Sequence, residues 1–409
     1  MRFRSQPIGG YVIHAVCGIN TISFAIDAAG ADTAGLLGFA VERIDPQANE
    51  QYFMYGFKVF KSVFPAPTKD LVVSTRDHPV QSFVWDDFTA KTNHRYAYRF
   101  HPLKGTPKNI DRSAAPISIE VRTEPLFTTG PHDVFFNRGV ASSQAYERRF
   151  GNKRPDDLTP PSKRRAALDW LSRDLDNALL KFIANAKAGD GLLGCFYEFR
   201  YEPVAAALKK AIDDGVDVQL VIDAKVNEHT DSKGTFHESF PRVENRKAVQ
   251  KAGIPAVRVH LREARRNDIQ HNKFMVLLKG VARTPAEVWT GSTNISTGGI
   301  HGQTNVGHWL RDGAAAERFQ AYWELLRQDP GGKAGDSAAA VRKKNEDFKK
   351  AVAALRTVPE KLADIAPGTT PIFSPRRGRS ILDLYFQLVD EADDLACITL
   401  AFGINKDFK

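Results

Sequence analysis

Four polar residues lie in two short segments of the chain, at a spacing suited to phosphate ester chemistry. His271 and Lys273 are separated by one residue, and Ser292 and Asn294 are likewise two apart. Alternate residues of a strand point to the same face, so each pair would present its side chains together. Lys273 can neutralise phosphate oxygens, while Ser292 and Asn294 can donate hydrogen bonds to them. His271 can attack phosphorus or move a proton near neutral pH.

Each pair also has a purely structural explanation. His271 and Lys273 could be a chance polar pair on an edge strand, and Ser, Gly and Asn are frequent in turns for backbone reasons. Two separate segments nevertheless carry complementary groups. We therefore favour phosphate binding for the set as a whole.

A scaffold must bring these two segments together, and the pattern around them predicts an α/β layer. Strands are expected at residues 192–199, 216–222, 256–261, 273–278, 287–290 and 305–310, with helices at 163–183, 203–214 and 314–327. Alternation of helices and strands is typical of a mainly parallel sheet flanked by helices. We expect this α/β domain to occupy residues 131–335.

The first 130 residues have a different pattern, with short alternating segments separated by Gly, Pro, Asp and Asn. The clearest are residues 96–100 and 117–121, which alternate with the period of a strand. The run from 83 to 103 resembles the middle strands of a fibronectin type III or related β-sandwich. An all-β sandwich accessory domain is therefore expected at residues 1–130.

The C-terminal part predicts a connector and a repeated unit. Residues 336–366 have the composition of a charged helical linker. Residues 367–409 then show an apolar helical face at 381–389 and an apolar strand at 396–402, the order already seen at 175–199. We expect residues 367–409 to be the start of a second, incomplete copy of the α/β unit.

Composition restricts the classes of partner and compartment. Lys and Arg total 57 against 48 Asp and Glu, a net charge of +9 that favours anionic partners such as nucleic acid or acidic lipid. Three cysteines, far apart, favour a reducing, cytoplasmic compartment and argue against a disulfide framework or a cysteine zinc site. No stretch approaches the roughly 18 apolar residues of an integral membrane segment. Metal-ligand spacing is absent, so we expect no metal or other cofactor.

The segments His271-Asn272-Lys273 and Gly291-Ser292-Thr293-Asn294 resemble the HxK and GSxN elements of the phospholipase D superfamily. The resemblance covers about residues 163–330. It implies that His271 is the nucleophile and forms a phosphohistidine, that Lys273 and Asn294 bind the phosphate, and that Ser292 supports the histidine. It also implies a bacterial-type phosphodiesterase, a hydrolase that cleaves a phospholipid or a nucleic acid.

Two departures from the family pattern bear on activity. The family motif continues as HxKxxxxD, and Leu278 occupies the aspartate position. Superfamily sites also combine two such motifs, whereas this sequence has one HxK with a GSxN partner. A homodimer, or a second half-site beyond the C-terminal segment, would supply the other histidine. The alternative is a catalytically incomplete module that binds phosphate or nucleic acid.

Three further segments are secondary candidates. The polar stretch 227–244, with His229 and His237, is expected to overhang the site as a substrate loop. His308 lies in an apolar strand and is expected to be a core histidine. The aromatic residues of the segment 197–201 are expected to cap the core in preference to lining the pocket.

Overall fold

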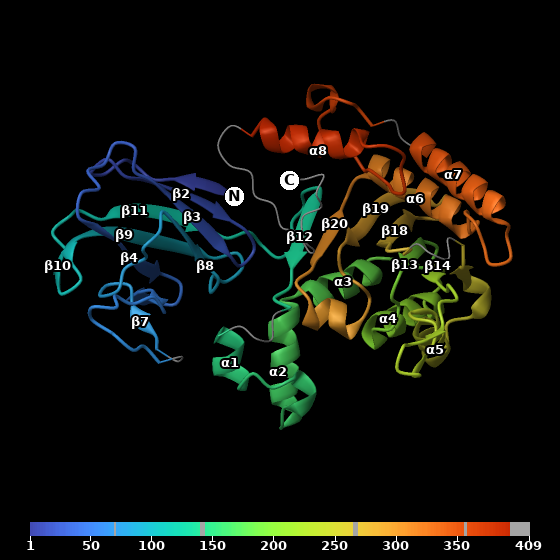
Figure 1. The fold of residues 1–409 in the computed structure, drawn as a ribbon, viewed down its shortest axis with the longest axis horizontal. Coiled ribbons are helices and arrows are strands. Elements are labelled where there is room, and N and C mark those ends of the chain that lie inside the picture. Colours follow the sequence, from blue (N-terminus) through green and yellow to red (C-terminus); the bar gives the residue numbers. More distant parts are fainter. Residues whose placement is uncertain (69–70, 140–143, 265–268, 356–357, 393–409) are drawn as a thin grey trace. The chain divides into compact units, whose positions relative to one another are not determined.

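The computed structural model describes residues 1–68, 71–139, 144–264, 269–355 and 358–392 (Figure 1). The chain divides into two compact units, residues 1–129 and residues 130–409. Each unit has its own hydrophobic core.

The first unit consists of two larger antiparallel sheets and a two-stranded ladder. The sheets have the orders β1-β2-β3-β8 and β10-β9-β4-β5, with β11 also paired to β9, and β6 pairs with β7. The strands are β1 Arg2–Arg4, β2 Val12–Cys17, β3 Ile22–Asp27, β4 Leu36–Asp45, β5 Glu50–Phe53, β6 Tyr55–Gly56, β7 Val73–Ser74, β8 Val84–Asp87, β9 Arg95–Thr106, β10 Asn109–Asp111 and β11 Ile117–Arg122. The predicted all-β N-terminal region is confirmed.

Alternating side chains of both larger sheets meet in one apolar core. Phe24 on β3 illustrates this, because its ring lies 4.7 Å from that of Tyr98 and 5.1 Å from that of Phe100, both on β9. All three side chains are essentially inaccessible to solvent. The closer resemblance to a fibronectin type III sandwich stays a prediction.

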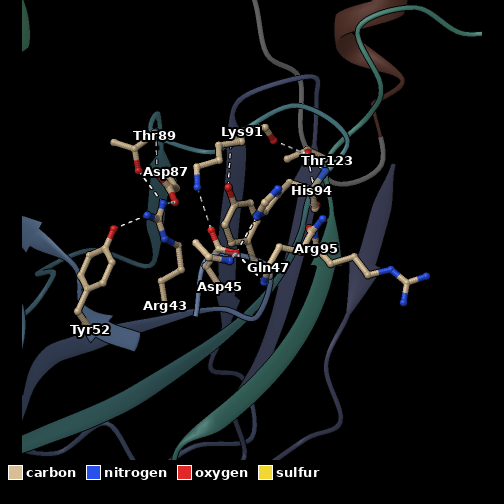
Figure 2. Close-up of polar contacts among 12 residues, drawn as sticks. Arg43, Asp45, Gln47, Tyr52, Asp87, Thr89, Lys91, His94, Arg95 and Thr123 are labelled. Atoms are coloured by element: carbon tan, nitrogen blue, oxygen red, sulfur yellow. Dashed lines mark hydrogen bonds and ion pairs between the residues drawn. The ribbon is translucent and has the colours of Figure 1, made fainter. Parts of the chain in front are cut away.

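A buried polar cluster also connects the two sheets (Figure 2). Arg43 on β4 donates a hydrogen bond of 2.9 Å to Asp87 on β8, and the Tyr98 hydroxyl donates to the same carboxylate at 2.6 Å. Nearby, Asp45 lies 2.7 Å from His94 Nε2. Burial opposes ionisation of Asp45, but hydrogen bonds from His94 and from backbone N–H groups outweigh it and lower the pKa of Asp45 to about 2.

The second unit is built on a seven-stranded sheet with the order β12-β20-β19-β18-β13-β14-β17. The strands are β12 His132–Phe136, β13 Gly191–Phe196, β14 Asp217–Asp223, β17 Val259–Arg262, β18 Lys273–Lys279, β19 Thr284–Gly291 and β20 Val306–Leu310. Only β13–β14 and β14–β17 pair in parallel, and the other neighbours are antiparallel. The prediction of a mainly parallel sheet is therefore wrong. The connection from β18 to β19 is too short for a crossover, so these strands can pair only in antiparallel fashion.

Helices cover both faces of this sheet (Figure 1). The helices of this unit are α1 Gln144–Phe150, α2 Pro161–Ser172, α3 Leu175–Ala184, α4 Glu202–Asp213, α5 Arg242–Ala252, α6 Gly313–Arg327, α7 Ala338–Leu355 and α8 Ser380–Asp390. Helices α3, α4 and α5 lie on one face, whereas α6 and α7 pack on the other and share a core with strand residues such as Val276.

The single long helix predicted for residues 163–183 is wrong, because α2 and α3 are separate. Arg173 and Asp174 lie between them with φ angles of 49° and 67°, in the left-handed region that ends a helix. Leu171 and Leu175, on either side of the break, are both buried. The apolar spacing therefore continues across the break and conceals it in the sequence.

Residues 336–366, predicted as a charged linker, contain α7, whose Phe348 and Val352 are buried in the core of the second unit. Helix α8 lies within the segment predicted to begin a second α/β copy. The strand predicted at 396–402 lies outside the described residues, and the second copy stays a prediction. Among the helices that the structure describes, none combines the length and apolar character needed to cross a membrane.

Candidate active site

The candidate residues lie at one end of the seven-stranded sheet, called here the site end. Strands β13, β14 and β17 run in parallel and finish there, and Lys273, the first residue of β18, pairs with Phe196, the last residue of β13. Strand β19 also finishes there, since its Gly291 pairs with Gly307 near the start of β20. Two segments that are separate in sequence, around 271 and around 292, therefore meet at this end.

His271 lies immediately before β18 and is exposed to solvent. Its ring stands edge-on to Tyr197, with 5.1 Å between ring centroids and an interplanar angle of 65°. Partial desolvation lowers the pKa of His271, and the positive charge of Lys273 lowers it further. The imidazole is therefore biased toward its neutral, nucleophilic form near neutral pH.

Lys273 is 7% exposed, so its ammonium group is largely removed from water. Its Nζ donates a hydrogen bond of 2.9 Å to the His271 carbonyl oxygen and lies 5.6 Å from the centroid of the Tyr197 ring. Burial lowers the pKa of Lys273 to about 8, although the negative charge of Glu198 acts in the opposite direction. No carboxylate of the described residues forms an ion pair with this ammonium. Such a cation is suited to binding an anionic group.

Asn294, in the turn after β19, is also buried. Its Nδ2 donates a hydrogen bond of 2.9 Å to Glu198 Oε1, while its Oδ1 is buried and has no hydrogen-bond partner among the described residues. Glu198 in turn accepts two hydrogen bonds from Arg200, at 2.9 and 3.1 Å. A carboxamide has two N–H donors, so the second donor of Asn294 remains for a ligand oxygen.

Ser292 has a different role from the other three. Its hydroxyl donates to Asn305 Oδ1 at 2.8 Å and accepts from the Val306 N–H at 3.0 Å. These bonds tie the turn after β19 to the start of β20. Ser292 therefore positions the turn that carries Asn294, whereas His271, Lys273 and Asn294 surround Tyr197 and Glu198.

Comparison with known proteins identifies a domain in this part of the chain. Residues 179–326 match the family model described as the PLD-like domain of cardiolipin synthase. This segment is a phospholipase D-like domain. No curated protein gives a significant match to the chain.

Several solved structures also resemble part of the chain. Nuc from Salmonella typhimurium, a phospholipase D family member, is 23% identical, with 38% of this chain and 87% of that chain covered and a TM-score of 0.28. NucT from Helicobacter pylori is 18% identical, with coverage of 39% and 90% and a TM-score of 0.28. Polyphosphate kinase from Porphyromonas gingivalis is 10% identical, with coverage of 42% and 26% and a TM-score of 0.27.

The segment 197–201 of the phospholipase D-like domain contacts the candidate site residues, although its sequence predicts only a cap on the core. Phe199 is fully buried and stacks on Phe196, as expected of a core cap. Tyr197, however, contacts His271 and Lys273, and Glu198 binds Asn294. Glu198 was not predicted as a site residue. Its signal in the sequence is a carboxylate among apolar residues at the end of a strand.

Asn245 on α5 is a second residue that the sequence does not reveal. It is fully buried, its Oδ1 accepts the Phe199 N–H at 2.7 Å, and its Nδ2 donates to the carbonyl oxygens of Tyr197 and Asp223 at 2.8 and 3.0 Å. Asn245 therefore fixes the ends of β13 and β14, and with them the backbone of Tyr197 and Glu198.

Leu278, at the aspartate position of the family motif, lies in the core of the phospholipase D-like domain. Its side chain is 5% exposed and belongs to the apolar cluster beneath α6. Leu278 lies opposite Gly191 on β13, five residues along β18 from Lys273. The substitution therefore places an apolar side chain in an apolar site.

The predicted substrate loop forms a hairpin of β15 His229–Thr230 and β16 Phe236–His237. The two histidine rings stack 5.0 Å apart, and His237 Nε2 lies 3.0 Å from Asp231. The hairpin leads to Phe240, whose ring lies 5.2 Å from the Arg200 guanidinium. Whether the hairpin covers a bound substrate stays a prediction.

The prediction that His308 is a core histidine is wrong. His308 is only partly buried and its Nε2 lies 3.0 Å from His132 Nδ1 on the neighbouring strand β12. Trp309 and Leu310, which follow His308 on β20, are both buried in the core. Within the described residues, no group of three or more His, Cys, Asp or Glu side chains is arranged to hold a metal ion.

Proposed function

We propose that the protein is a phosphodiesterase that cleaves a phospholipid or a nucleic acid through a phosphohistidine on His271. The observation that supports this most directly is the grouping of three side chains around Tyr197 and Glu198. They are an imidazole biased toward its neutral form, a buried ammonium without a carboxylate partner in the described residues, and a buried carboxamide that has a second N–H donor besides the one that Glu198 accepts. Together they can receive a phosphodiester, attack it and stabilise the charge that develops.

The reaction has two displacements at phosphorus. In the first, a ring nitrogen of His271 forms a P–N bond, and the P–O bond to the leaving alcohol breaks. In the second, water attacks phosphorus and the P–N bond breaks, which releases a phosphomonoester and restores the imidazole. Lys273 neutralises the nonbridging oxygens and Asn294 donates a hydrogen bond to one of them, while Ser292 holds the turn that carries Asn294.

The leaving alcohol needs a proton, and in this proposal a second histidine donates it. That histidine comes either from another copy of the chain in a homodimer or from a second half-site. If it comes from a second copy, specific activity should rise with protein concentration as dimers form. Analytical ultracentrifugation over the same concentration range would show whether the two quantities change together.

The direct test is to trap the covalent intermediate. The protein is mixed with a phosphodiester substrate, quenched in alkali and examined by intact-mass spectrometry for a phosphoryl adduct that maps to His271. The His271→Ala variant should lose both adduct and turnover, whereas His14→Ala, which changes an exposed histidine of β2 in the first unit, should keep both. Full activity in His271→Ala would overturn the proposal.

A noncatalytic phosphate-binding module is the second candidate, and the buried Lys273 ammonium favours it, since this group suits binding whether or not turnover follows. In that case the wild-type chain would bind a phosphodiester oligonucleotide or phospholipid without cleaving it at any protein concentration. The Lys273→Met variant would then lose binding, while His271→Ala would retain it.

A further inference from the structure

The loop between β6 and β7 lies near the label β7 in Figure 1. It exposes apolar side chains that the core of the first unit does not use. Every residue from 61 to 68 is exposed. Phe57 is 62% exposed, and Val63 and Phe64 are each 38% exposed. Single exposed apolar residues are ordinary, but several in one short loop indicate an interaction surface.

This loop is anchored at its base. The backbone of Met54, just before β6, receives a hydrogen bond of 2.9 Å from the Thr75 N–H. His78 is buried, and its ring lies 5.6 Å from that of Phe60 and 5.2 Å from that of Phe64. The His78 Nδ1 also accepts the Phe60 N–H at 3.3 Å. One side of the loop therefore packs on the unit, and the other side is held toward solvent.

The charge of the loop is predominantly positive. Residues 57–72 include three lysines and one acidic residue, Asp70, and Lys58 and Lys61 are exposed among the apolar side chains. Lysine can keep its ammonium group at a charged surface while its aliphatic stem lies along apolar neighbours. Interleaved basic and apolar side chains are complementary to a bilayer with anionic headgroups.

We propose that this loop docks the N-terminal unit on an anionic lipid bilayer. Phe57 and Val63 enter the boundary between headgroups and acyl chains, and Lys58 and Lys61 contact headgroup phosphates. Protein hot spots are enriched in Trp, Tyr and Arg, and single-stranded nucleic acid is bound by aromatic rings that stack on bases. The tip of the loop, Val63-Phe64-Pro65-Ala66-Pro67, is apolar and rich in proline. This composition fits a bilayer better than it fits a protein hot spot or single-stranded nucleic acid. The proposal does not depend on the phosphodiesterase activity, since docking is measured without turnover.

The experiment measures sedimentation of the full chain with sucrose-loaded vesicles. Wild type should bind vesicles of phosphatidylglycerol and phosphatidylcholine, and should not bind phosphatidylcholine alone. The variants Phe57→Ser/Val63→Ser and Lys58→Gln/Lys61→Gln should each weaken binding by roughly tenfold or more. Two matched controls should bind like wild type: Val281→Ser, which changes a valine that is 91% exposed in the other unit, and Lys108→Gln, which removes an exposed lysine from the β9–β10 turn.

Failure of the wild-type chain to bind anionic vesicles would overturn the proposal, as would unchanged binding by both double variants. If the double variants instead lose affinity for a single-stranded oligonucleotide and keep vesicle binding, the loop is a nucleic-acid surface and the bilayer assignment is wrong. Thermal melts check folding. The lysine variant changes only exposed polar groups and should fold normally, so it tests the proposal even if the apolar variant is unstable.

Discussion

Glu198 and Asn294 are 96 residues apart in sequence and share a buried hydrogen bond of 2.9 Å at the site end of the sheet. This bond fixes the orientation of the Asn294 amide, and the paired hydrogen bonds from Arg200 fix Glu198 in turn. The Asn294 Oδ1 has no hydrogen-bond partner among the described residues, so the bond to Glu198 is the one that orients the amide. Glu198 is therefore a positioning residue for the proposed reaction.

Replacement of Glu198 should lower turnover more than substrate binding. Loss of a buried hydrogen bond to a charged group is worth about 1.5–3 kcal/mol, so kcat of Glu198→Ala should fall by roughly 10- to 100-fold with a smaller change in KM. Glu198→Gln keeps an acceptor oxygen and should restore part of kcat. Steady-state kinetics on a chromogenic phosphodiester, with melts as the folding check, would measure this. Equal losses in the two variants would contradict the positioning role.

Titration of Lys273 should limit activity at alkaline pH. Its pKa of about 8 means that the ammonium needed for phosphate binding is lost as pH rises through that value. We expect kcat/KM to fall above pH 8. At the acidic end, protonation of His271 lowers kcat/KM, and the lowered pKa of this group places that limb below about pH 6.5. In Lys273→Arg the alkaline limb should disappear, because arginine does not titrate in this range.

The same group makes a prediction about stability. Its folded pKa of about 8 lies below the unfolded value near 10.5, so between these values the unfolded chain binds more protons. The free energy of unfolding should therefore rise with pH from about 8 to about 10.5, by up to about 3 kcal/mol from this residue. Urea titrations of wild type and Lys273→Met across that range would isolate the effect. A constant difference between the two proteins would contradict it.

Replacement of Asn245, which takes no part in the proposed reaction, should strongly lower the stability of the fold. Asn245→Ala leaves the Phe199 N–H and two backbone carbonyls without their side-chain partner, and each unsatisfied buried group costs about 1–3 kcal/mol. We expect a loss of about 3 kcal/mol or more in the free energy of unfolding. Arg246→Ala, an exposed neighbour on α5, should change stability by less than about 0.5 kcal/mol. Urea unfolding of both variants provides the comparison.

The Arg43–Asp87 pair should stabilise the N-terminal unit without influencing catalysis. Removal of one partner from a buried ion pair costs about 3–5 kcal/mol, so Asp87→Ala should strongly destabilise that unit. The double variant Arg43→Met/Asp87→Leu should recover most of the loss, because no unpaired charge remains. Hydrogen exchange of peptides from β4 and β8 would localise the effect. Equal instability in both variants would contradict this explanation.

Local patterns in the sequence determined much of the scaffold. The strands predicted at 273–278 and 287–290 lie within β18 and β19, and the helices predicted at 203–214 and 314–327 differ from α4 and α6 by no more than one residue at either end. These elements are amphipathic or fully apolar, so burial enforces the same period that the sequence shows. The positions of His271 and Asn294 beside them followed from the HxK and GSxN pattern.

The tertiary structure alone decided how these elements pair and what surrounds the reactive groups. Apolar spacing does not distinguish parallel from antiparallel neighbours, so the mixed sheet followed from the connections between strands. The apolar spacing also continues across Arg173 and Asp174, where the backbone angles end one helix and the next helix begins. The partners of Asn294 and Tyr197 come from distant segments, since Glu198 and Asn245 reach them only when β13, β19 and α5 are packed together. A hydrogen bond between such segments has no local period, and for that reason the sequence showed the reactive residues but not the residues that hold them.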